Sequence, residues 1–71
     1  PMIARDKFKL GQQVKLTKLG KRLVAVDGST HGYVLGFTRE PAKVVIEPQG
    51  YEPREYHMDH WEPVNNAEQI A

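Results

Sequence analysis

Apolar and polar residues alternate in several short stretches of the chain, and glycine, proline or charged turns separate these stretches. A period of two places successive side chains on opposite faces, which is typical of half-buried strands. The pattern predicts strands over residues 13–17, 31–38, 43–47, 54–57 and 62–64. The strand over 31–38 has apolar residues on both faces and is expected at the centre of the sheet. Pro63 cannot donate a ladder hydrogen bond, so the last strand is expected at an edge.

The segments between these strands give weaker signals. Residues 58–61 fit one tight helical turn before the last strand. Residues 19–26 fit either a strand or part of a long folded loop, and residues 27–30 indicate a turn. We expect no amphipathic helix of useful length, which sets aside functions that depend on a helix.

Five short strands, a long first connection and a 3-10 turn before the last strand predict an all-β fold. The expected architecture is a single small five-stranded SH3-like barrel over residues 2–64, followed by a frayed tail over 65–71. Pro1 is interpreted as a remnant of tag cleavage, so the natural chain is expected to start at Met2. The predicted core consists of Val14, Leu16, Val34, Val44, Ile46, Met58, Trp61 and Val64.

A chain of 71 residues has room for one small core, and such scaffolds often need additional support. Cysteine is absent, which excludes disulfides and thiolate metal sites. A metal bound by histidine and self-association as a homo-oligomer are the two remaining forms of support, and self-association is the expected one. No apolar run is long enough to span a bilayer and the N-terminus lacks the apolar stretch of a secretion signal, so we expect no membrane partner and a cytoplasmic location.

The net charge of +1 conceals an uneven distribution. Residues 1–30 carry seven basic and two acidic side chains, a balance of +5, whereas residues 31–71 carry three basic and seven acidic ones, a balance of −4. A basic patch of this size suits contact with phosphates or acidic proteins, although solvated charge of this kind also occurs without any such partner.

Aromatic and basic residues supply the candidate binding surface. Exposed aromatic side chains could stack bases or pack a peptide, and basic side chains on the first strand and long loop are expected beside them. Packing in a second small core or a self-association surface is the alternative for the aromatic residues, with Tyr51 expected to be the most exposed. The candidate partner-binding residues are Lys15, Lys18, Lys21, Arg22, Tyr33, Phe37, Tyr51 and Tyr56.

Catalytic and metal-binding patterns are weak. His57 and His60 flank Asp59, but a structural zinc site needs four ligands. We expect instead that a neighbouring carboxylate satisfies His57 and that Asp59 or His60 caps the helical turn. A glycine-framed nucleophile and a phosphate-binding loop are both absent, so the sequence predicts no catalytic residues, no cofactor, no metal and no enzyme.

Three motifs carry a resemblance to known proteins. They are Gly11-Gln12-Gln13-Val14, residues 32–37 (Gly-Tyr-Val-Leu-Gly-Phe) and residues 56–64 (Tyr-His-Met-Asp-His-Trp-Glu-Pro-Val). With them, residues 11–64 resemble small, mostly uncharacterised proteins encoded by phages, prophages and plasmids. The resemblance implies an SH3-like barrel and a mobile-element origin, and it supplies no activity.

Two further resemblances are more distant. The glycine and valine pattern of Gly11, Val14, Gly20, Gly32 and Val34 is similar to the KOW type of barrel, which would imply contact with nucleic acid or protein. The chain also resembles the type II plasmid dihydrofolate reductase, whose fourth-strand Gln and Ile hold nicotinamide and pterin. Aligned on Tyr56, those positions are Arg54 and Glu55 here, and that family's basic first-strand residue falls on Leu16.

Two hypotheses of function follow. The leading one is a non-enzymatic accessory module of a phage or other mobile element that docks on a host or phage protein, mainly through apolar and aromatic contacts. The alternative is nucleic-acid binding, to RNA or DNA, through the basic Lys15–Arg22 surface, with an affinity that falls steeply with salt. A reductase resembling the type II dihydrofolate reductase is a remote third hypothesis.

Overall fold

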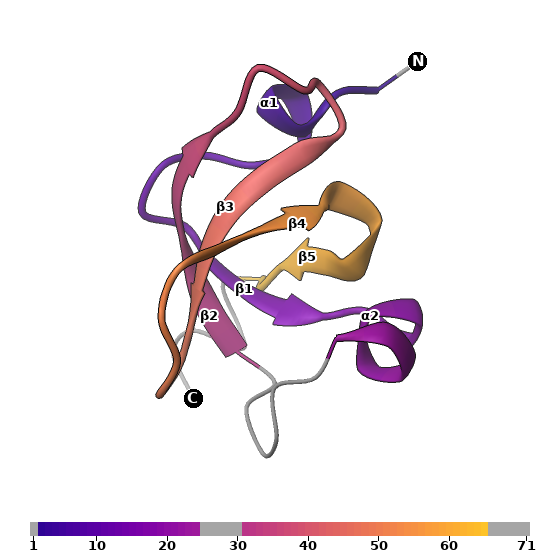
Figure 1. The fold of residues 1–71 in the computed structure, drawn as a ribbon, viewed down its shortest axis with the longest axis vertical. Helices are drawn as coiled ribbons and strands as arrows, with labels where there is room; N and C mark the ends of the chain where they lie inside the picture. The colour runs from indigo at the N-terminus through magenta and orange to yellow at the C-terminus, as the bar shows by residue number, and fades with distance from the viewer. Residues whose placement is uncertain (1, 25–30, 66–71) are drawn as a thin grey trace.

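The computed structural model describes residues 2–24 and 31–65. These residues form five strands, two short helices and one 3-10 turn (Figure 1). The strands are β1 (Gln13–Leu16), β2 (His31–Phe37), β3 (Lys43–Pro48), β4 (Arg54–His57) and β5 (Trp61–Pro63). The helical elements are α1 (Ala4–Lys7), α2 (Lys18–Leu23) and the 3-10 turn η1 (Met58–His60). All five predicted strands and the 3-10 turn are confirmed, and no predicted end differs from the observed one by more than one residue.

The strands form one antiparallel sheet in the order β4-β3-β2-β1-β5. β2 is the central strand, as the sequence predicts, and β5 lies at an end of the order, as Pro63 requires. β4 forms the other end. No ladder between β4 and β5 is found in the described part of the chain, so the sheet is open and closure into a barrel is not shown.

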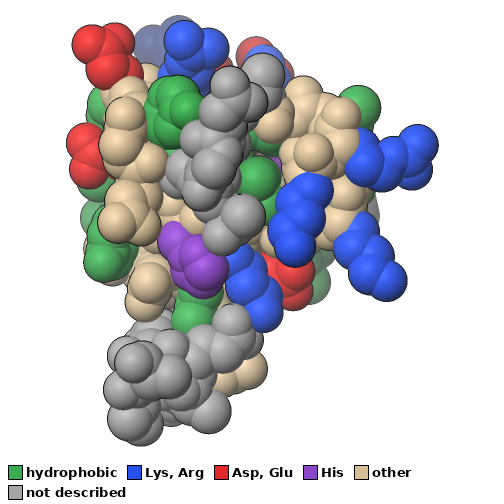
Figure 2. Space-filling model, turned by 90° about the horizontal axis from the view of Figure 1, so that it is seen from below, with side chains coloured by type: hydrophobic (Ala, Val, Ile, Leu, Met, Phe, Trp, Pro, Cys, Tyr) green, Lys and Arg blue, Asp and Glu red, His purple; other side chains and the backbone are tan. Residues whose placement is uncertain are grey.

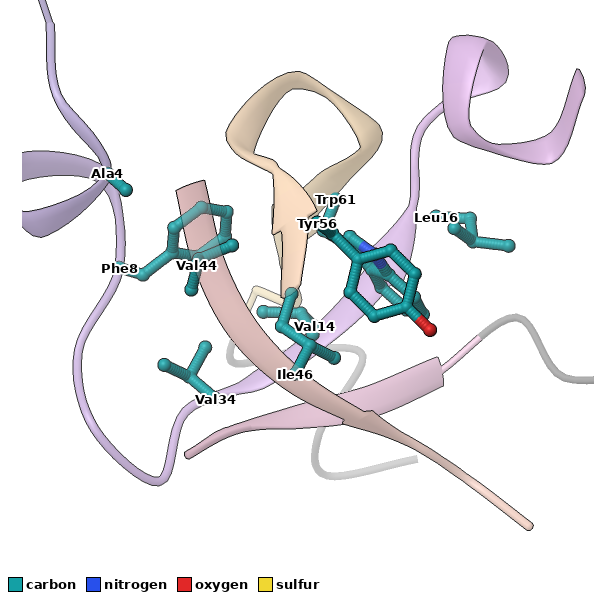
Figure 3. Packing of buried hydrophobic residues seen from close by; sticks show 9 residues of the cluster. All are labelled: Ala4, Phe8, Val14, Leu16, Val34, Val44, Ile46, Tyr56 and Trp61. Atoms are coloured by element: carbon teal, nitrogen blue, oxygen red, sulfur yellow. The ribbon is translucent and has the colours of Figure 1, made fainter. Parts of the chain in front are cut away.

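The core lies on one face of this sheet (Figure 3). Seven of the eight predicted core residues are buried, whereas Met58 is only partly buried and packs against the others. The buried hydrophobic core contains three further residues that the sequence does not predict, namely Ala4, Phe8 and Tyr56. Trp61 is fully buried, and its ring packs edge-on against Tyr56 with 5.4 Å between the ring centroids.

Helix α1 is an unpredicted element near the N-terminus. Its four residues are too few to produce a helical period in the sequence. Two hydrogen bonds fix it to distant parts of the fold: Ala4 N–H donates to the Pro41 carbonyl at 2.7 Å, and Lys7 Nζ donates to the Met58 carbonyl at 2.7 Å. Tertiary contacts therefore hold a helix that would be unstable in isolation.

Helix α2 replaces the strand or loop expected from residue 19 onward. Thr17 is its N-cap, since the Thr17 Oγ1 accepts a hydrogen bond from the Gly20 N–H at 3.0 Å and donates one to the Asp59 carbonyl at 2.7 Å. Gly20 is buried against η1, where a side chain would collide with the His60 carbonyl oxygen. The cap and the glycine together attach α2 to η1.

Several predictions lie outside the described residues: the roles of Pro1 and of the tail beyond residue 65, and the turn over 27–30. In residues 2–24 and 31–65, no helix has the length and apolar character needed to cross a membrane.

Candidate docking site

The structure distributes the eight candidate partner-binding residues over separate regions. Lys18, Lys21 and Arg22 lie on α2, and Lys15 lies on β1. Tyr33 and Tyr51 line one hollow together, Phe37 lies at the end of β2, and Tyr56 belongs to the core. The expected continuous surface of aromatic and basic side chains is therefore not formed.

Tyr56 corrects the prediction most directly, because it is buried rather than exposed. Only 9% of the residue is accessible, and its ring packs edge-on against Trp61. The hydroxyl points away from the cluster (Figure 3). Burial raises the pKa of Tyr56 above 10.0, and the nearby Arg54 guanidinium partly opposes this increase. The period of two in β4 predicts which residues share a face, but it does not say which face is buried.

Phe37 and Lys15 are also less available than the sequence suggested. The Arg5 guanidinium lies 4.9 Å from the centre of the Phe37 ring, so a cation of the chain itself already covers this aromatic residue. Lys15 is half-buried in β1, where it is paired with His31 on one side and Glu62 on the other.

Helix α2 has three distinct faces. Gly20 and Val24 face the fold, and Lys18, Lys21 and Arg22 are exposed. Positions i, i+3 and i+4 share a helix face, so these basic residues form one surface. Leu19 and Leu23, which are 43% and 62% exposed, lie beside it. Figure 2 shows basic side chains gathered on one side of the molecule.

An open hollow of about 420 Å³ lies between α2 and β4, and we call it the edge hollow. Leu23, Val24 and the largely buried Tyr56 supply its apolar surface, and charged and imidazole side chains surround them. Sequence reasoning missed this hollow because it did not predict α2. The lining residues are Leu23, Val24, Lys43, Arg54, Glu55, Tyr56, His57 and His60.

The edge hollow lies beside the free edge of the sheet, because β4 pairs only with β3 in the described residues. The Met58 N–H donates to the Ala42 carbonyl at 2.8 Å, one step beyond the pairing of His57 with Lys43. Hydrogen-bonded and non-hydrogen-bonded pairs alternate in an antiparallel ladder. The backbone N–H and C=O groups of Glu55 and His57 therefore point away from β3, towards the free edge.

His57 has a local structural role. Its Nδ1 accepts a hydrogen bond from the Asp59 N–H at 3.1 Å and lies 3.6 Å from Asp59 Oδ2. The Asp59 carboxylate lies near the His57 ring, as predicted, but Nδ1 is satisfied by the Asp59 backbone N–H and not by the carboxylate. The predicted cap is also wrong, since His57 itself caps η1. Among the described residues, no three His, Cys, Asp or Glu side chains are grouped as a metal site would require.

A second hollow, of about 480 Å³, lies at the turn between β3 and β4, and we call it the tyrosine hollow. The Tyr51 N–H donates to the Pro48 carbonyl at 3.0 Å, and Gly50 has a φ of 85°, so residues 48–51 form a turn that requires glycine at its third position. Tyr51 is 40% exposed, as predicted, but Tyr33, at 49%, is the more exposed of the two. The lining residues are Tyr33, Glu47, Pro48, Gln49, Gly50, Tyr51 and Glu52.

Comparisons of the chain with protein-family models, with curated proteins and with solved structures found no match. The resemblances drawn from the motifs are therefore untested.

Proposed function

We propose that this protein is a non-catalytic docking module that binds an extended segment of a partner protein at the edge hollow. One observation carries the proposal: an apolar hollow lies directly beside a free sheet edge. An extended peptide that adds to a sheet edge gains affinity from backbone hydrogen bonds and specificity from side-chain pockets. The edge hollow offers both features.

The bound segment pairs with β4 as an added strand. The outward N–H and C=O groups of Glu55 and His57 supply the backbone hydrogen bonds. An apolar side chain of the segment fills the space between Leu23, Val24 and Tyr56. Burial of such a side chain contributes roughly 1.5–3 kcal/mol before the cost of ordering the segment.

Charge around the edge hollow favours an acidic segment. Arg54 and Lys43 line it together with the single carboxylate of Glu55, and Lys43 also lies 3.6 Å from the Glu40 carboxylate. Lys21 and Arg22 are exposed on the adjacent α2. Arg54 is close enough to affect the pKa of the Tyr56 hydroxyl. A carboxylate of the bound segment near Arg54 can accept hydrogen bonds from the Arg54 guanidinium and the Tyr56 hydroxyl. The bond from the charged guanidinium is stronger than one between neutral groups.

Two observations favour docking over catalysis. At the position where the reductase family has its basic first-strand residue, this chain has Leu16, which is 5% exposed and part of the core. Arg54 and Glu55 are exposed on an edge strand rather than set in an enclosed site for stacked rings. The five-strand order with a 3-10 turn supports the proposal of an SH3-like barrel, and the host or phage origin of the partner is proposed from the resemblance alone.

Nucleic-acid binding is the second candidate, favoured by the three exposed basic residues of α2. Single-strand binding proteins combine such charge with aromatic stacking surfaces. Here the exposed tyrosines lie instead with Glu47 and Glu52, whose carboxylates repel phosphates. Any binding by α2 would therefore be electrostatic and would weaken steeply with salt.

The test begins with selection of binders from a random library of short peptides displayed on phage. We expect enrichment of extended sequences that combine acidic and apolar residues. Glu55→Pro removes an outward N–H without removing a β3–β4 hydrogen bond, so it should weaken peptide binding by tenfold or more. Glu55→Ala keeps the N–H, and this matched control should retain binding.

The outcomes separate the candidates. Equal binding by the Glu55→Pro and Glu55→Ala variants would contradict pairing along β4. Fluorescence anisotropy with labelled single-stranded and double-stranded oligonucleotides at two salt concentrations tests the second candidate. Micromolar binding that is steeply salt-dependent and lost in K18E/K21E/R22E would favour nucleic acid over protein.

A further inference from the structure

We propose that the tyrosine hollow is a second binding site, which receives an arginine side chain of a partner protein. It shares no lining residue with the edge hollow. Two half-exposed tyrosines beside two carboxylates form a surface that is complementary to a cation with a flat apolar face.

The walls of the hollow come from adjacent strands and a defined turn. Tyr33 on β2 lies directly opposite Glu47 on β3, so their side chains share one face of the sheet. The turn over residues 48–51 brings Tyr51 and Glu52 back to the same region. Tyr33 and Glu47 are therefore held on strands, and Tyr51 and Glu52 lie in the short connection between β3 and β4.

The floor of the hollow is tightly packed. Pro48 is buried and is paired with Gly32, where an added side chain would approach the Glu47 carbonyl oxygen to 2.5 Å and the Pro48 Cα to 3.0 Å. Gly32 therefore permits close approach of the two strands beneath the hollow. A tight floor limits the entropy lost when a ligand orders the walls.

The charge of the lining specifies a cation. Glu47 and Glu52 are acidic, and no Lys, Arg or His lines the hollow. Within residues 2–24 and 31–65, neither carboxylate forms an ion pair. Elsewhere the chain supplies its own cations to its aromatic rings: Arg5 lies over Phe37 at 4.9 Å, and Lys7 lies over Phe8 at 5.2 Å. No described cation lies over Tyr33.

Arginine fits this lining better than lysine. A guanidinium group is planar, so it can stack on a tyrosine ring while its N–H groups donate to carboxylates at the edge. It is also more weakly hydrated than an ammonium group, which lowers the cost of removing it from water. Binding by one residue is weak, so the site would add specificity to a larger contact.

The test is an NMR titration of ¹⁵N-labelled protein with the peptide acetyl-Gly-Arg-Gly-amide. The same peptide with citrulline is the matched control, because citrulline keeps the shape of arginine and lacks its charge. We expect shifts at the amides of Tyr33, Glu47, Tyr51 and Glu52, and about tenfold weaker binding of the citrulline peptide. Glu47→Gln combined with Glu52→Gln should reduce arginine binding to the citrulline level.

A control double variant, E40Q/E62Q, changes the net charge equally at two residues that line neither hollow, and it should retain arginine binding. Equal binding of both peptides, shifts outside the tyrosine hollow, or no binding at millimolar arginine peptide would each overturn the proposal. Since neither the peptide nor the Glu47 and Glu52 substitutions involve the edge hollow, the result is independent of the proposed docking at β4.

Discussion

The two hollows are similar in size but differ in what builds them. The edge hollow depends on Tyr56, which packs against Trp61 in the core, and on α2, which is fixed to η1. The tyrosine hollow is lined by half-exposed side chains above a glycine turn. In the first hollow the binding surface is also part of the core, whereas in the second it lies outside it.

This difference separates stability from recognition. Substitution of Tyr56 in the edge hollow should alter folding and binding together, because the same ring serves both. Substitutions of exposed side chains in the tyrosine hollow should alter binding alone. Charge follows the same division, since basic side chains dominate around the edge hollow and carboxylates line the other.

The largest expected contrast is between two tyrosines. Tyr56→Ala removes a buried ring and its contact with Trp61, and it should reduce the free energy of unfolding by roughly 3–5 kcal/mol, as for other buried aromatic residues. Tyr51→Ala removes a ring that is 40% exposed, and it should change the free energy of unfolding by no more than about 0.5 kcal/mol. Urea unfolding followed by tryptophan fluorescence measures both values.

A loss of similar size in the two variants would contradict the division between the hollows. If Tyr56→Ala is too unstable to purify, Tyr56→Leu keeps an apolar side chain and should leave a measurable transition. It should still be less stable than the Tyr51→Ala variant.

A smaller effect is expected at the junction of α2 and η1. A side chain at Gly20 collides with the backbone of His60, so Gly20→Ala should cost about 1–3 kcal/mol and weaken peptide binding at the edge hollow. Gly36→Ala is the matched control, since a Cβ there would meet nothing within 4 Å. Urea unfolding should place Gly36→Ala near the wild type, and equal losses in both variants would contradict the proposed junction.

The sequence was sufficient for the strands and most of the core. The β-branched run over 43–47 is a local signal for a strand, and the structure confirms that strand as β3. Helix α2 was not predicted, because its cap is completed by the Asp59 carbonyl and its buried glycine fits against His60. Asp59 and His60 lie about forty residues along the chain from α2, so a local sequence pattern does not indicate these contacts.

The candidate site was predicted in part. Tyr33 and Tyr51 are exposed as expected, because Tyr33 alternates with the buried Val34 and Tyr51 lies in a proline and glycine turn. For Tyr56 the sequence leaves exposure and packing both open, since in β4 only Tyr56 is buried and no apolar neighbour on the strand marks the inner face. The edge hollow requires the unpredicted α2, so no reading of β4 alone could find it.

The smallest expected effect concerns the hydroxyl of Tyr56. Burial raises its pKa above 10.0 in the folded state, so its contribution to stability is complete below pH 10 and is lost as the pH rises through the folded pKa. The unfolded chain releases the proton first, and the free energy of unfolding therefore falls in this range. Tyr56→Phe lacks this proton, whereas every other titrating group is common to both proteins. Urea midpoints measured between pH 8 and pH 11 should fall more steeply for the wild type than for Tyr56→Phe, and parallel profiles would show that the hydroxyl is not held in a desolvated environment.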